Sequence, residues 1–275
     1  MTNGATITLD GVGSNIETYS GTGPTYQTVD QTLVTNNGTL NVLSSRNFSA
    51  GHAITNNGTI QLGGGSFTAP SLSNGSGAVL SGFGSFGPTG GTTVGSWVQV
   101  SPGSAAANGY LGTLSFSTGL TLGQGGSTTF DIMNATGTAG TDFDKMAVTG
   151  TLAVTATSGT PFTINVESIN PGTGLPGSAN FNLSSSYTWT LATATSVSGF
   201  SATDFALNTS SFTNGLGGGS FSVSSDSTDI FLNFTPVPEP STWALMGVGA
   251  AALAWAGWRR RLPKAPRISS PSAGS

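Results

Sequence analysis

Short segments in which apolar and polar residues alternate recur through residues 1–235 of this chain. Clear examples are residues 112–116, 145–154, 162–166 and 229–234. A period of two is typical of a β-strand that buries one face and exposes the other. Before residue 240 no segment shows the 3.6-residue period of an amphipathic helix. The pattern therefore predicts an all-β fold.

One strand-and-turn unit is repeated. Residues 34–40 read VTNNGTL, residues 54–60 read ITNNGTI, and residues 72–80 are a degenerate third copy. A strand that returns every 20 residues or so is what a solenoid coil needs, because stacked coils bury an apolar face that one coil leaves exposed. Asn and Gly tolerate left-handed backbone angles, so we expect them at the bends. Asn and Thr at equivalent positions are expected to form ladders.

A run of antiparallel hairpins joined by Asn-Gly turns is the alternative. The nearly identical heptapeptides at a fixed spacing favour coils. We predict β-solenoid repeats (a parallel β-helix) over residues 1–155 and a β-rich, sandwich-like cap over residues 156–235. Residues 1–10 already read as a strand and show no signal peptide, so we expect the natural N-terminus to lie further upstream. A cytoplasmic protein is the alternative explanation.

Charge is scarce and unevenly distributed. Only 7% of residues are charged, and 42 are glycine. Up to Pro236 there are ten acidic residues and two basic ones, Arg46 and Lys145. Such a body lacks the cations that neutralise phosphates, so nucleic acid is excluded as a partner. The chain has no cysteine, which excludes disulfides and thiolate metal sites.

The C-terminal segment differs from the body in its pattern of apolar and charged residues. We predict a linker over residues 236–242, a transmembrane helix over residues 243–258, which contain no charged residue, and a basic cytoplasmic tail over residues 259–275. Sixteen residues span about 24 Å against about 30 Å of hydrocarbon, so flanking side chains must complete the span. The side chains expected at the membrane interfaces are Trp243, Trp255, Trp258, Arg259, Arg260 and Arg261. A buried helix of a soluble domain is the alternative.

The order Pro-Glu-Pro, apolar helix, arginine cluster resembles the PEP-CTERM sorting signal of Gram-negative bacteria. The motif residues are Val237, Pro238, Glu239, Pro240, Ser241 and Thr242, followed by Arg259 to Arg261. The resemblance implies recognition and cleavage by a membrane-embedded exosortase near Pro-Glu-Pro, often alongside exopolysaccharide production. It places the chain in the inner membrane during sorting and its body in the periplasm, at the cell surface or in the extracellular matrix. The same tail type is also labelled an ice-binding protein C-terminal domain. Residues 262–275 extend beyond the usual end of the signal.

A second resemblance concerns the body. Residues 100–104, 112–114 and 142–152, read together, resemble the β-helical stalks of autotransporter-like bacterial surface proteins. The resemblance covers roughly residues 38–154. It implies a structural or adhesive stalk.

Candidate chemistry is sparse, and we predict no catalytic residue, no metal site and no cofactor. His52 lies between two repeat strands, where a solvated turn residue is expected. Asp142 and Asp144 would share one strand face, as a glycosidase pair or a Ca²⁺ site requires, and Asp226 with Asp229 is a second weak Ca²⁺ candidate. The threonines available for an ice-binding face are few and irregular: Thr6, Thr8, Thr35, Thr39, Thr55 and Thr59.

These patterns together predict an exported, membrane-anchored surface or structural protein. Adhesion or a place in an exopolysaccharide or biofilm matrix is the expected role. The expected partners are membrane lipid, an exosortase-type protease and extracellular polysaccharide. Two alternatives remain: a polysaccharide-active β-helix enzyme, and an ice- or carbohydrate-binding module.

Overall fold

The computed structural model describes residues 1–19, 25–103, 110–237 and 242–260. Eight short strands line one wall of the coils: β1 (Thr2–Asn3), β5 (Thr35–Asn36), β8 (Ile54–Asn56), β10 (Leu72–Asn74), β12 (Thr92–Val94), β15 (Leu120–Leu122), β18 (Thr151–Val154) and β21 (Ser196–Ser198). They form two four-stranded parallel sheets, in the order β1-β5-β8-β10 and β12-β15-β18-β21. Successive strands of this wall therefore follow one another coil by coil.

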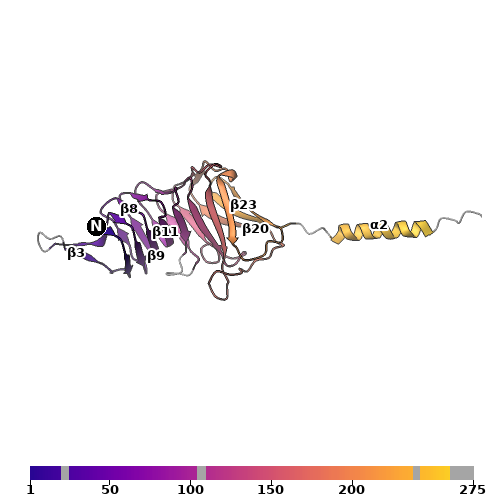
Figure 1. Cartoon of the computed structure of the whole chain (residues 1–275), viewed down its shortest axis with the longest axis horizontal. Coiled ribbons are helices and arrows are strands. Elements are labelled where there is room, and N and C mark those ends of the chain that lie inside the picture. Colours follow the sequence, from indigo (N-terminus) through magenta and orange to yellow (C-terminus); the bar gives the residue numbers. More distant parts are fainter. Residues whose placement is uncertain (20–24, 104–109, 238–241, 261–275) are drawn as a thin grey trace, which may run out of the picture. The chain divides into compact units, whose positions relative to one another are not determined.

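The remaining walls belong to one large sheet. Its strands are β2 (Thr6–Asp10), β6 (Thr39–Leu43), β7 (Phe48–Ser49), β9 (Thr59–Thr68), β11 (Val79–Phe86), β13 (Gln99–Pro102), β14 (Thr113–Phe116), β16 (Ser127–Ile132), β17 (Lys145–Val148), β19 (Phe162–Ser168), β20 (Tyr187–Thr193), β22 (Phe205–Ser211), β23 (Ser220–Ser225) and β24 (Asp229–Thr235). A separate hairpin joins β3 (Glu17–Tyr19) to β4 (Tyr26–Thr28), and short helical turns occur at α1 (Val29–Thr32) and η1 (Ala202–Asp204). Figure 1 shows the strands side by side along the body.

Strand register confirms coils rather than hairpins for the repeated unit. Thr35 pairs with Thr55 in a parallel ladder, and Thr39 pairs with Thr59. Both pairs are 20 residues apart in the sequence, so one repeat is one coil. Hairpins would instead have placed neighbouring copies antiparallel.

Asparagine side chains form the expected ladder at the first bend. Asn3 Nδ2 donates to Asn36 Oδ1 at 2.7 Å, and Asn36 Nδ2 donates to Asn56 Oδ1 at 2.8 Å. Asn56 Nδ2 continues to Asn74 Oδ1 at 3.2 Å. Asn36 and Asn56 are fully buried, so each amide needs its neighbour in the next coil to satisfy its hydrogen-bonding groups.

The glycines of the repeat have a different role from the one we expected. Neither Gly38 nor Gly58 has a positive φ. Instead, a Cβ at Gly58 would lie 2.0 Å from the carbonyl oxygen of Gly38, and a Cβ at Gly38 would lie 2.1 Å from that of Ala5. The bend requires glycine because consecutive coils approach each other too closely for any side chain.

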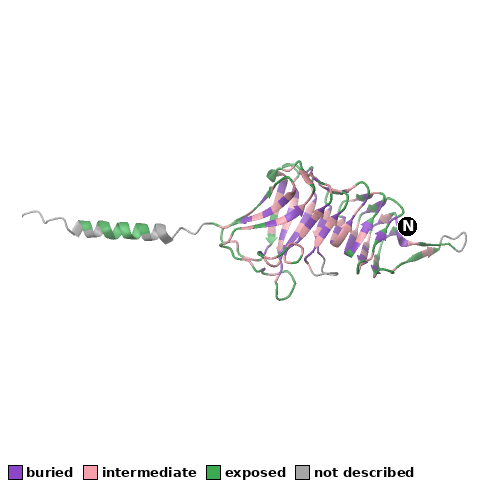
Figure 2. Cartoon of the chain, turned by 180° about the vertical axis from the view of Figure 1, so that it is seen from behind, coloured by how far each residue is buried: buried purple, intermediate pink, exposed green. Residues whose placement is uncertain are grey.

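A column of aromatic rings fills the interior. Phe48 and Phe67 have ring centroids 5.3 Å apart, Phe67 and Phe86 are 5.7 Å apart, and Phe86 and Phe116 are 6.1 Å apart. All four side chains are fully buried. One ring from each coil therefore packs against the ring of the next, and buried residues recur along the length of the body (Figure 2).

Coil stacking passes without a break across residue 155, where we had placed a domain boundary. β18 pairs with β21, and β19 pairs with both β16 and β22, all in parallel. Residues Met1–Pro236 form one compact unit. The large sheet ends in the antiparallel strands β20, β24 and β23, and β23 contacts the opposite end strand β22. The coil strands thus continue into one nearly closed sheet, to which the strands of the β-rich cap predicted over residues 156–235 also belong, apart from β21.

Residues Val237–Ser275 form a second unit, which contains helix α2 (Thr242–Arg260). Among the described residues, no helix is both long enough and apolar enough to serve as a membrane span. The prediction of a transmembrane helix over residues 243–258 is therefore not supported. The uncharged run is short for a bilayer, and several of its positions are Gly or Ala, which contribute little apolar surface.

Candidate functional site

The sorting segment begins where the compact body ends. β24 ends at Thr235, and Val237 is already 52% exposed. Pro238, Glu239, Pro240 and Ser241 lie outside the described residues. A protease that cleaves near Pro-Glu-Pro would therefore find its target sequence after the last residue of the body's core.

Helix α2 carries the remaining residues predicted in this segment. Thr242, Trp243, Arg259 and Arg260 belong to the helix, whereas Arg261 and the rest of the tail to Ser275 lie outside the described residues. Trp255 and Trp258 are 55% and 64% exposed, and the helix residues whose burial is described are exposed (Figure 2).

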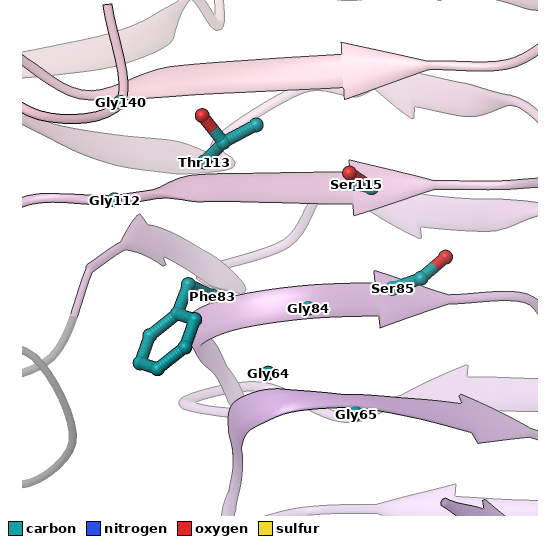
Figure 3. Close-up of a pocket in the computed structure, with 9 residues that line it drawn as sticks. All are labelled: Gly64, Gly65, Phe83, Gly84, Ser85, Gly112, Thr113, Ser115 and Gly140. Atoms are coloured by element: carbon teal, nitrogen blue, oxygen red, sulfur yellow. The ribbon is translucent and has the colours of Figure 1, made fainter. Parts of the chain in front are cut away.

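A shallow groove of about 380 Å³ crosses β9, β11 and β14 on the outside of the body. Figure 3 shows the hydroxyl groups of Ser85 and Ser115 on adjacent strands, with the ring of Phe83 at one side of the groove. Gly64, Gly65, Gly84, Gly112 and Gly140 also line it. The groove thus offers hydroxyl groups, peptide groups and one half-buried aromatic ring.

Coil packing explains the glycines of this groove. A Cβ at Gly65 would lie 1.8 Å from the carbonyl oxygen of Arg46, and a Cβ at Gly84 would lie 2.4 Å from that of Gly65. Adjacent coils approach each other too closely at these positions for any side chain. Among the described residues, the lining consists of Gly, Ser, Thr and Phe and includes no titratable side chain.

Two buried carboxyl groups lie near this groove. Asp144 Oδ1 accepts a hydrogen bond from the Gly112 amide at 2.9 Å, and Asp144 Oδ2 accepts one from the Asp131 amide at 3.1 Å. Asp144 is fully buried and Asp131 is 2% exposed. The Oδ1 atom of Asp131 has no hydrogen-bond partner within the described structure.

Burial governs the protonation of these groups. It raises the pKa of Asp131 to about 8, with a further contribution from the nearby Glu167 carboxylate. Burial, followed by the charge of Asp131, also raises the pKa of Asp144 well above its usual value. The pKa of Glu167 is raised by burial as well. The sequence analysis assigned no role to Asp131. Its position between the apolar residues Phe130 and Ile132, both buried, could have indicated a buried carboxyl group.

The structure separates the side chains of Asp142 and Asp144, and it places Asp226 and Asp229 in a hydrogen-bonded turn. Asp142 Oδ2 accepts a hydrogen bond from the Thr138 amide at 2.8 Å and lies in a loop, whereas Asp144 points into the protein. Asp226 Oδ1 accepts hydrogen bonds from the amides of Thr228 and Asp229, which closes the β23–β24 turn. Within the described residues, no group of three or more potential metal-binding side chains occurs.

The other residues that we considered for a functional site lie apart from one another. His52 is exposed in the loop between β7 and β8. Thr35 lies between Thr2 and Thr55 on one wall, and Thr39 lies between Thr6 and Thr59 on another. The second column continues with Val79, so the threonines do not extend as a regular array along the body.

Residues 236–261 match the family model of the PEP-CTERM protein-sorting motif. No curated protein and no solved structure matches the chain. The motif indicates an exported surface protein that is processed by exosortase, a membrane protease. These comparisons give no support to the autotransporter-like resemblance of the body or to the ice-binding label of the tail.

Proposed function

We propose that this chain is a bacterial surface protein whose body is a structural component of the extracellular matrix, in contact with exopolysaccharide. The PEP-CTERM match at residues 236–261 carries the proposal. The stacked coils support a scaffold role, because each coil adds length without requiring a new core. The polar, charge-poor composition is also compatible with a hydrated polysaccharide environment.

The proposal includes no catalytic role for the body. Both Asp131 and Asp144 are buried, and the groove of Figure 3 has no titratable group in its lining. A glycosidase needs two carboxyl groups that reach the scissile bond. Shortening of a polysaccharide by the purified chain would contradict this part of the proposal.

Sorting can be tested in a bacterium that encodes an exosortase, beside an isogenic strain that lacks it. The full chain is expressed behind a secretory signal peptide, and its mass and location are followed by immunoblotting of cell fractions. We expect a shortened, surface-associated or released product in the first strain only. Replacing Pro238, Glu239 and Pro240 with alanine should abolish the shortening.

A matched control is Glu17→Ala, which removes a glutamate from the β3–β4 hairpin and should be processed normally. The proposal fails if the wild-type chain has the same mass and location in both strains. It also fails if the triple alanine variant is processed as efficiently as the wild type.

A further inference from the structure

One tryptophan occupies an unusual place in the body. The turn between β12 and β13 contains Ser96 and Trp97, whose φ angles are 47° and 71°. Left-handed angles favour Gly and Asn, and a bulky aromatic residue there is a genuine outlier. The side chain of Trp97 is nevertheless 76% exposed. The body therefore keeps a large apolar ring in solvent on a strained backbone, and such strain tends to persist at functional sites.

Adjacent coils hold this turn in place. The amide of Ser96 donates to the Gln124 carbonyl at 2.7 Å, and the amide of Trp97 donates to the Gly125 carbonyl at 2.9 Å. On the other side, the amide of Gly77 donates to the carbonyl of Trp97 at 3.2 Å. Hydrogen bonds from both neighbouring coils thus fix the backbone from which the indole ring projects.

Trp97 is one of the residues that line a pocket of about 430 Å³. It is built from the same corner of three successive coils, with Trp97 from the first, Gln124 from the second, and Gly159 and Thr160 from the third. Gln124 and Thr160 are exposed, so their amide and hydroxyl groups are available for hydrogen bonds. None of the described residues that line the pocket is charged.

This combination suits a sugar better than other ligands. The C–H face of a pyranose ring packs against an aromatic face, while its hydroxyl groups exchange hydrogen bonds with amide and hydroxyl side chains. A lining without Lys or Arg offers no positive charge to pair with a phosphate, sulfate or uronate group. The pocket therefore favours a neutral sugar unit.

We propose that Trp97 and its pocket bind a neutral hexose unit of an extracellular polysaccharide, with the indole ring as the stacking platform. The proposal rests on the proposed function for its biological setting. Binding itself is measured on purified protein, so a failure of sorting and a failure of sugar recognition are separate outcomes.

The test uses the purified full chain and three neutral glucans, namely cellulose, laminarin and dextran, with acidic alginate as the comparison. Binding is measured by co-sedimentation with cellulose and by affinity electrophoresis in gels containing each soluble polymer. We expect at least one neutral glucan to bind more tightly than alginate. Trp97→Ala should weaken that binding at least about tenfold, a typical effect for a central aromatic contact.

Two further variants separate binding from folding. Trp97→Gly removes the ring and relieves the left-handed strain, so it should lose binding while its unfolding temperature stays equal or rises. Gly159→Leu should fill the pocket without disturbing the fold, because nothing lies within 4 Å of a Cβ placed at this residue. Tyr26→Ala is the control, since Tyr26 is a 65% exposed aromatic residue on β4 and its loss should not change binding.

Failure of every neutral glucan to bind would overturn the proposal, as would equal binding by Trp97→Ala and the wild type. Self-association that requires Trp97 in the absence of glycan, measured by analytical ultracentrifugation, would assign the ring to a protein contact instead. That result would also overturn the proposal.

Discussion

Asp131 and Asp144 place two carboxyl groups where a charge is costly. Both are buried, and in the described structure the one ion pair joins Arg46 to Asp30, so neither carboxyl group forms an ion pair. Burial of an ionised carboxylate without a counter-charge is unfavourable, and the group keeps its proton instead. The pair is therefore expected to make folding stability depend on pH.

The sign of this dependence follows from the pKa of Asp131. An unfolded aspartate releases its proton near pH 3.9, whereas Asp131 in the folded chain holds its proton up to about pH 8. Between these values folding takes up a proton, so the free energy of unfolding falls as the pH rises from about 4 to about 8. Urea denaturation at a series of pH values should show this fall.

Asp131→Asn should flatten much of that slope and raise stability at pH 8 by an amount on the order of a few kcal/mol. Asp10→Asn removes an exposed carboxylate from the end of β2 and controls for the loss of one negative charge. Equal slopes for the wild type and Asp131→Asn would contradict the prediction.

At the scale of the element, the repeated coil is defined by how closely its neighbours approach. The spacing of the coils at the first bend is set by the parallel register and by the hydrogen bond between Asn36 and Asn56. The glycine after each Asn-Asn pair allows the coils to approach this closely. A methyl group at Gly58 would meet the backbone of the preceding coil. Such a contact cannot be relieved by a change of side-chain rotamer, so the coils themselves must separate.

Gly58→Ala should therefore destabilise the chain by about 2–3 kcal/mol or prevent folding, as overpacking against rigid backbone does. Gly13→Ala is the matched control, because a Cβ there has nothing within 4 Å and the residue has no positive φ. Its effect should stay within about 0.5 kcal/mol. Urea midpoints that are equal for the two variants would show that the bend tolerates a side chain.

At the scale of the whole molecule, the chain separates into a body, Met1–Pro236, and a tail unit, Val237–Ser275. The buried residues of the core belong to the body, and the described burial of α2 is that of an exposed helix. The tail unit carries the sorting motif, and the hydrophobic core described for the body includes no residue of the tail. Processing near residue 238 would leave the core intact.

Deletion of residues 237–275 should leave the unfolding temperature of the body within about 2 °C of that of the full chain, which corresponds to less than about 1 kcal/mol. Differential scanning calorimetry of the two proteins measures this directly. A large drop in the unfolding temperature, or loss of a cooperative transition, would mean that the tail helps to stabilise the coils.

The sequence by itself determined the repeat, its parallel stacking and the sorting segment. Similar residues at a fixed spacing experience similar environments, so Asn36 and Asn56 predict a ladder from the sequence alone. The Pro-Glu-Pro segment could likewise be identified from the sequence, because its recognition depends on local residue order. A membrane span depends instead on the total apolarity of a long segment. The sorting motif therefore did not establish that residues 243–258 span a membrane.

Only the tertiary structure decided which residues the coils bring together. It assigned the repeat glycines to close backbone approach, since a sequence cannot show whether a glycine serves a positive φ or a tight contact. It placed Asp131 beside Asp144, and it assembled the pocket of Trp97 from turns about 30 residues apart. These features depend on how coils of unequal length align, and loop lengths in the chain do not fix that alignment.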